Sequence, residues 1–154
     1  MTETTKKRLN EIDGDQIAQA FDKIILHHTA TPRESKFDVE WCRLLHKGFG
    51  WRDIGYHYYI DADAELHIGR PVRMRGAHTL GQNADSIGIA YCGGMKGGRQ
   101  HFTMTYEQSQ TVLDLIQRLR DVTGKELPLF GHRDFKPTFC PGFDVHDEKA
   151  WPRL

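Results

Sequence analysis

The stretch KIILHHTATP, Lys23 to Pro32, sets two histidines at the end of an apolar run and follows them with turn residues. An Ile/Leu run that ends in Thr, Ala and Pro is typical of a buried strand leading into a loop. Neighbouring strand residues point to opposite faces of a sheet, so His27 and His28 are not expected to bind one metal together. We expect one of them to bind the metal, while the other packs against its neighbours or orients the site. The residues themselves leave open which does which.

Further elements are predicted on the C-terminal side of this strand. A helix is expected over 38–47, with Asp38 as cap and Gly48 as stop. Its apolar residues recur at i, i+4, i+7 and i+8: Phe37, Trp41, Leu44 and Leu45. A hairpin follows over 51–71, then a strand in SIGIAYCGG, a capped helix over 105–124 and a short strand in LPLFGHRD.

The alternation of these elements, without repeats, predicts an α/β fold: a single domain with a central mixed β-sheet flanked by α-helices. A chain of 154 residues fits one domain. Residues 1–20 are charged and poor in large apolar side chains, so a mobile arm or loosely docked helix with little core is expected there. Residues 21–154 are expected to form the domain itself.

The balance of acidic and basic residues argues against two classes of binding partner. Lys plus Arg number 21 and Asp plus Glu number 21, so no cationic excess exists for generic attraction to nucleic acid or to an anionic membrane. The N-terminal sequence MTETTKKRLNEIDGDQ lacks the apolar centre of a secretory signal, which predicts synthesis in the cytoplasm without a signal peptide.

The three cysteines give no disulfide framework. Cys42 and Cys92 are expected to be buried, reduced core residues, with a disulfide between them as the open alternative. Cys140 stands in a loop eight residues after His132 (140 − 132 = 8). Zinc favours imidazole and thiolate, and a catalytic site keeps three protein ligands and one open position. One histidine of the 27/28 pair, His132 and Cys140 would meet that need.

Several motifs resemble those of a known family. ILHHTAT, WRDIGYHYYI, GRP, GAHTLGQNADSIGIAYCGG and GHRDFKPTFCPGFD are similar, in the family's order, to the motifs of zinc-dependent N-acetylmuramoyl-L-alanine amidases. That family includes phage endolysins and peptidoglycan recognition proteins. The resemblance covers residues 22–145 and implies that residues 21–154 form a zinc amidase catalytic domain.

The resemblance implies a role for particular residues. His27, His132 and Cys140 would hold one Zn²⁺ per chain, and Tyr56 would be the catalytic tyrosine that assists at the oxyanion. Phage members usually carry a lysine where this chain has Thr138, so oxyanion stabilisation would come from Thr138 or be supplied differently. Lys136 stands close by in sequence, with a solvated side chain as the alternative.

His78 and Asn83 would meet the glycan or the stem peptide, with a purely loop-building role as the alternative. Tyr56 equally suits a core position in an aromatic strand, and Trp51 suits either a glycan cleft or the core.

The function implied by the resemblance is hydrolysis of the amide between N-acetylmuramic acid and L-alanine in peptidoglycan. A phage or prophage endolysin that acts on the cell wall is expected, as a monomer without stable membrane association and without nucleic acid. Two alternatives belong to other classes. One is a non-catalytic peptidoglycan-binding module, which the intact ligand set disfavours. The other is an amidase that also inhibits an RNA polymerase.

Overall fold

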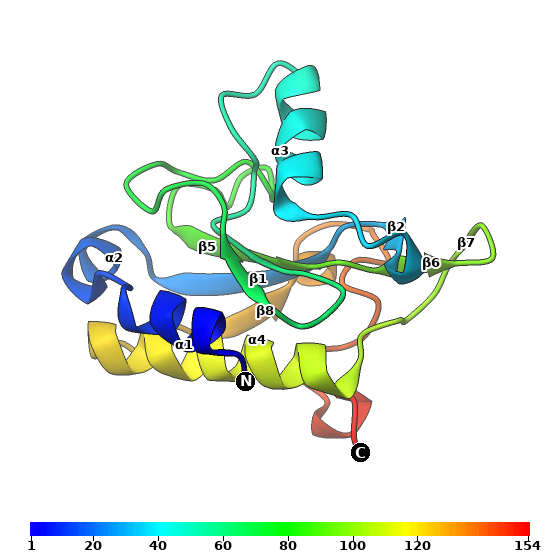
Figure 1. Ribbon diagram of the computed structural model, residues 1–154. Coiled ribbons are helices and arrows are strands. Elements are labelled where there is room, and N and C mark those ends of the chain that lie inside the picture. The colour runs from blue at the N-terminus through cyan, green and yellow to red at the C-terminus, as the bar shows by residue number, and fades with distance from the viewer.

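A five-stranded β-sheet forms the centre of the molecule (Figure 1). The computed structural model describes all 154 residues. The strand order is β4-β3-β5-β1-β8, with β4 antiparallel to β3 and the other pairs parallel. The strands are β1 Lys23–His28, β3 Tyr58–Ile60, β4 Leu66–Ile68, β5 Ser86–Tyr91 and β8 Leu129–Gly131. The predicted mixed sheet and the hairpin within 51–71 are therefore confirmed.

A second, three-stranded sheet continues from the ends of β1 and β5. It contains β2 Thr31–Pro32, β6 Gly94–Lys96 and β7 Arg99–Gln100, in the order β2-β6-β7. The sequence did not predict these strands, because they are two or three residues long and contain no apolar run that would mark them.

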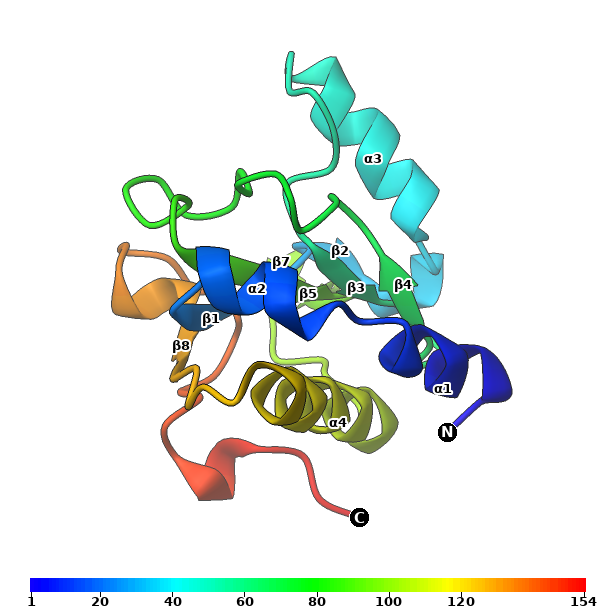
Figure 2. The same cartoon turned by 90° about the vertical axis from the view of Figure 1, so that its left-hand side faces the viewer.

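Helices lie on both faces of the main sheet (Figures 1 and 2). α4 runs beneath one face, and α3 stands on the other and projects away from the body. The helices are α1 Glu3–Asn10, α2 Gly14–Ala20, α3 Val39–Gly48 and α4 Tyr106–Thr123, with short 3₁₀ turns η1 Arg33–Ser35, η2 His132–Asp134 and η3 Glu148–Ala150.

The larger hydrophobic core lies between the sheet and α4. The capping box predicted at the start of α4 is present, with Thr105 and Gln108 as its partners. Ile24 and Leu26 of β1 are fully buried in this core. The helix residues that share it are Val112, Leu115, Ile116 and Leu119. The alternation of β1 thus assigns every second side chain to the α4 face.

The N-terminal residues contribute to this core, contrary to the sequence expectation. Ile17 is 0% exposed and Leu9 is 8% exposed, and both belong to the α4-side core. Arg118 of α4 donates a hydrogen bond to the carbonyl of Leu9. The expectation of little core was wrong because α1 and α2 each bury one large side chain, which is too sparse to recognise as a pattern. The division of the chain at residue 20 stays a prediction.

α3 begins after the predicted cap, since the Asp38 carboxylate accepts from the backbone N–H of Trp41. The face expected to be apolar is nevertheless not the buried one. Leu44 is 71% and Leu45 is 41% exposed. The residues of the helix that are buried instead are Val39, Cys42 and His46. The apolar spacing therefore predicted the helix correctly and its buried face wrongly.

Cys42 and Cys92 are buried, free thiols in the smaller core beneath α3. The structure thus resolves the open alternative in favour of reduced core residues. None of the helices combines the length and the apolar character that a membrane-spanning segment requires.

Replacing Ile17 tests whether α2 is part of the core. Ile17→Ala is expected to lower the free energy of unfolding by about 2–4 kcal/mol, because it leaves a cavity in a fully buried site. Leu44→Ala, on the exposed side of α3, should change it by less than about 0.5 kcal/mol. Urea unfolding followed by circular dichroism measures both. Equal stability of the two variants would mean that residues 1–20 form a loosely docked arm after all.

Candidate metal centre

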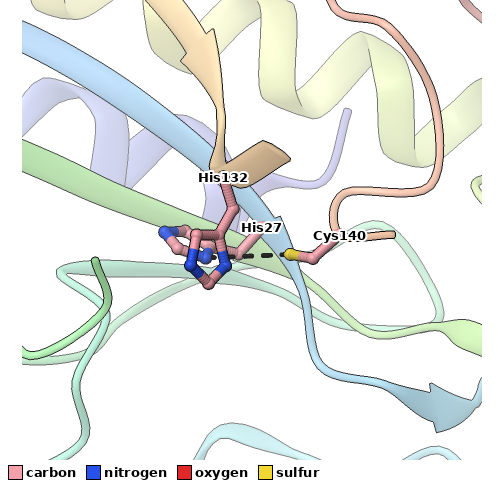
Figure 3. A group of neighbouring side chains, drawn as sticks. All are labelled: His27, His132 and Cys140. Carbon is pink, nitrogen blue, oxygen red and sulfur yellow. Dashed lines mark hydrogen bonds between the residues drawn. The ribbon is translucent and has the colours of Figure 1, made fainter. Parts of the chain in front are cut away.

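Three potential metal ligands meet where parallel strands of the main sheet end (Figure 3). His27 lies at the carboxyl end of β1, His132 opens η2 directly after β8, and Cys140 follows in the next loop. Their ligand atoms all lie within 4.8 Å of one another, and Nδ1 of His27 is 3.8 Å from Sγ of Cys140. β1 and β8 are neighbouring parallel strands, so their carboxyl ends lie side by side.

His27 and His28 point to opposite faces, as the strand pattern predicted. His27 turns to the α3 side, where its ring lies 5.2 Å from that of Tyr56 and 4.7 Å from that of His132. His28 turns to the α4 side, beside Tyr91 and Phe139. His27 is therefore the member of the pair that joins the ligand cluster.

The other histidine of the pair supports the local backbone. The side chain of His28 accepts a hydrogen bond from the backbone N–H of Ala30. Its own backbone N–H donates to Sγ of Cys140 over 3.3 Å. A hydrogen bond to sulfur favours the thiolate that a metal ligand must become.

His78 fixes the ring of His27 from behind. Nδ1 of His78 is 2.8 Å from Nε2 of His27, and Oγ1 of Thr79 is 3.3 Å from the same nitrogen. Nε2 of His78 faces the carbonyl and hydroxyl oxygens of Ser86, and that hydroxyl already donates to the carbonyl of Gln82. His78 therefore donates from Nε2 and accepts at Nδ1.

This network determines the tautomer of His27. Its Nε2 carries the proton that His78 accepts, so its Nδ1 keeps a lone pair. That lone pair is on the nitrogen near Cys140. A ligating imidazole whose other nitrogen is held by a hydrogen bond is the usual arrangement in metal sites.

Two glycines make room for His78. A Cβ on Gly88 of β5 would lie 2.6 Å from the His78 ring, and one on Gly76 would lie 2.5 Å from it. Any larger residue at these positions would displace the imidazole that orients His27.

The electrostatics of the cluster favour neutral donors. Burial lowers the pKa of His27 well below its ordinary value and lowers the pKa of His78 to about 3. Burial and then the charge of Lys136 lower the pKa of His132. Burial raises the pKa of Cys140 to about 12. At neutral pH the imidazoles are thus ready to bind a cation, whereas the thiol must first lose its proton.

The donor set fits zinc. Two imidazoles and one thiolate are common zinc ligands, and three protein ligands leave the fourth tetrahedral position open. Zinc bonds of roughly 2.0 Å to nitrogen and 2.3 Å to sulfur place these two ligand atoms about 3.5 Å apart in a tetrahedral site. The separation of 3.8 Å between Nδ1 of His27 and Sγ of Cys140 is slightly longer than this distance.

The cluster opens into a cavity of about 240 Å³, hereafter the metal cavity. Besides the three ligands, its lining includes Tyr56, Thr138, His46, Trp51, Ala77 and His78. Burial raises the pKa of Tyr56 well above its ordinary value, so the phenol keeps its proton and can donate it in a hydrogen bond. Oγ1 of Thr138 accepts from the backbone N–H of Cys140 over 3.3 Å, which leaves its own proton free.

A second cavity, of about 510 Å³, adjoins the first. It contains Asn83 and Lys136, and it shares Trp51, Ala77, His78 and His132 with the metal cavity. Oδ1 of Asn83 accepts from the backbone N–H groups of His78 and Thr79, both over 2.9 Å. Asn83 thus holds the loop that carries His78, and its contact with a substrate stays a prediction, as does that of His78.

Sequence reasoning missed the supporting residues. His46 lines the metal cavity and accepts from the backbone N–H of Gly55 over 2.8 Å. Thr79 and Ser86 complete the network behind His27. His46 lies within a helix without any local motif, so no signal marked it. Thr79 directly follows His78, and this adjacency was the one available signal.

Comparison with known proteins identifies relatives of this chain. The family model described as N-acetylmuramoyl-L-alanine amidase (Amidase_2) matches residues 18–143, a segment that contains all three candidate ligands. The endolysin of Klebsiella phage KP32 is 33% identical over 135 residues, covering 86% of this chain and 86% of the endolysin. A peptidoglycan-recognition protein of Drosophila simulans is 33% identical over 136 residues, covering 84% of this chain and 74% of that protein.

A solved structure has the same fold. The endolysin N-acetylmuramoyl-L-alanine amidase LysCS from Clostridium intestinale URNW superposes with a TM-score of 0.68 at 29% sequence identity. The match covers 83% of this chain and 79% of that chain. The resemblance inferred from the sequence motifs is therefore confirmed.

Zinc affinity should depend on pH through Cys140. The pKa of its thiol is about 12, so zinc must displace one proton at neutral pH. The apparent affinity is expected to rise about tenfold per pH unit between about pH 6 and 8. Calorimetry in two buffers of different ionisation enthalpy should detect about one proton released by the wild type and none by Cys140→Ala. An affinity that does not change with pH would contradict thiolate ligation.

Replacing His78 tests its support of His27. His78→Ala should weaken zinc binding about 10- to 100-fold in competition with a chelator, because the His27 tautomer is no longer fixed. His78→Asn, whose side-chain oxygen can accept in place of Nδ1, should recover part of the loss. His101→Ala, on an exposed histidine, is the matched control. Wild-type affinity in His78→Ala would limit His78 to loop structure.

Proposed function

Because this chain belongs to the N-acetylmuramoyl-L-alanine amidase family, we propose that it hydrolyses the amide between N-acetylmuramic acid and L-alanine in peptidoglycan. The observation that carries this proposal is the cluster of His27, His132 and Cys140 at the wall of an open cavity. A module that only recognises the polymer needs no such cluster, so its retention supports an enzyme.

Zinc held by these residues would supply a Lewis acid that polarises the scissile carbonyl and acidifies a water molecule. The ring of His27 is held for this task by His78. The strand that carries His27 is rigid, because β1 is hydrogen-bonded to β5 on one side and to β8 on the other. Such rigidity keeps the reacting groups in register.

Tyr56 is the proposed donor to the carbonyl oxygen as negative charge develops on it. The phenol lines the metal cavity beside His27 and stays protonated, because burial raises its pKa. One well-placed donor to an oxyanion contributes roughly 3 kcal/mol to the barrier reduction in other enzymes.

Thr138 is the proposed second donor. Its hydroxyl lies on the metal cavity, whereas Lys136 lines only the adjoining one. The backbone N–H of Cys140 donates to the Thr138 oxygen and thereby orients it. This placement supports Thr138, rather than Lys136, in the role that the family's phage members give to a lysine.

The biological setting that we propose is that of an endolysin, with the cell wall as its site of action. Phage endolysins are among the relatives that match most of this chain. Peptidoglycan is the corresponding partner. No observation on the structure favours a role as an RNA polymerase inhibitor.

Digestion of purified peptidoglycan tests the activity. The zinc-loaded protein should release free stem peptides that begin with L-alanine and leave the glycan strands intact, as read by mass spectrometry. Cys140→Ser should release none. If both proteins bind the polymer and neither releases peptides, the family fold serves recognition here and the enzyme proposal fails.

The same assay tests Tyr56. Tyr56→Phe should bind zinc normally and lose roughly 100-fold or more in turnover, because a single oxyanion donor is removed. Tyr106→Phe, at the start of α4 and outside both cavities of the site, is the control. Unchanged turnover in Tyr56→Phe would assign the phenol to packing.

A further inference from the structure

The cavity next to the metal cavity has an unusual charge pattern. We define the Lys136 lobe as the cavity of about 510 Å³ lined by Trp51, Ala77, His78, Thr79, Leu80, Asn83, His132 and Lys136. Half of these residues also line the metal cavity. The lobe is therefore within direct reach of a molecule whose reacting bond lies beside His132.

Lys136 is the one permanently charged side chain in this lining. It takes part in none of the ion pairs of the molecule and makes no side-chain hydrogen bond. Its backbone is nevertheless fixed, because its N–H donates to the carbonyl of His132 and its own carbonyl accepts from the N–H of Thr138. The backbone of Lys136 is thus fixed beside the site, and its ammonium group has no partner within the protein.

No Asp, Glu or Arg side chain lines the lobe. The ammonium group of Lys136 therefore has no anionic neighbour in this lining, and it gives the lobe its positive charge.

Asn83 supplies a hydrogen-bond donor of fixed orientation. Both backbone N–H groups that its Oδ1 accepts belong to the 78–79 segment. Two such bonds assign the oxygen and leave the NH₂ group, which makes no hydrogen bond within the protein. The lobe therefore offers an ammonium group and an amide donor, with no competing acceptor charge. This combination is complementary to a carboxylate.

We propose that the Lys136 lobe binds a free carboxylate of the stem peptide, about one or two residues beyond the scissile amide, and that Lys136 makes this enzyme prefer an acidic stem. The inference rests on the proposed function. Two extended residues reach about 7 Å, which suits a cavity that shares four lining residues with the metal cavity. A neutral carboxamide at the same place would lose the attraction to the ammonium group.

The test uses two synthetic muramyl dipeptides. Each carries L-alanine amide-bonded to the amino group of D-glutamate, whose side-chain carboxyl is capped as a methylamide and whose α-carboxyl group is either free or converted to a carboxamide. The zinc-loaded full chain, Lys136→Gln, Lys136→Arg and Arg133→Gln are assayed for kcat/KM on both. Arg133 is the matched control, because it is an exposed cation on the same turn and lines neither cavity.

The expected result is a preference of about tenfold for the free carboxylate in the wild type and in Arg133→Gln. Lys136→Gln should lose the preference through slower cleavage of the carboxylate substrate, with the carboxamide substrate unchanged within about twofold. Lys136→Arg should keep most of it. A preference in Lys136→Gln equal to that of the wild type would overturn the proposal, as would an equal loss on both substrates.

A binding measurement separates failure of this proposal from failure of the proposed function. Calorimetric titration of the same proteins in zinc-free form with the two dipeptides reports the affinity ratio without turnover. If the wild type cleaves neither dipeptide but binds the carboxylate form tighter in a Lys136-dependent way, the lobe is correct and the amidase proposal is not. If cleavage occurs and the affinity ratio is independent of Lys136, the amidase proposal is correct and the proposal for the lobe is not.

Discussion

The alternation of side chains along β1 is the constraint on which the rest of the structure depends. This strand is buried on both faces, so each of its residues must suit one of two environments. Ile24 and Leu26 point into the core against α4. His27 points to the opposite face of the sheet, where the metal cavity lies. A shift of one residue would exchange the faces of His27 and His28 and remove His27 from the ligand cluster. The hydrophobic core therefore fixes which histidine side chain joins His132 and Cys140.

Parallel pairing then brings distant segments to that histidine. β8 lies beside β1, so the turn after it delivers His132, and the following loop delivers Cys140 next to the backbone of His28. β5 lies on the other side, and its Gly88 leaves space for His78. The cluster thus depends on the order of strands in the sheet rather than on any compact sequence motif. Its neutral imidazoles and protonated thiol let the chain fold around it without burying a charge.

Much of this arrangement could be predicted from the sequence, and the failures have physical causes. The main strands followed from apolar or aromatic runs that end in turn residues, and the capped α4 followed from its periodicity and capping box. The opposite orientation of His27 and His28 followed from the alternation of side chains in any strand. The buried face of α3 and the packing of Ile17 did not, since they depend on contacts with distant elements. The support of His27 by His78 depends on space above Gly88, which no local pattern records. The ligand set and the role of Tyr56 came from the family resemblance.

X-ray absorption spectroscopy of the zinc-loaded protein tests the central claim most directly. The account predicts one sulfur at about 2.3 Å and two imidazole nitrogens at about 2.0 Å. The sulfur signal should vanish in Cys140→Ala and persist in Cys42→Ala and Cys92→Ala, and one imidazole should vanish in His27→Ala but not in His28→Ala. A zinc site without sulfur, or one that loses an imidazole with His28 rather than His27, would contradict the claim that β1 selects His27 for the metal.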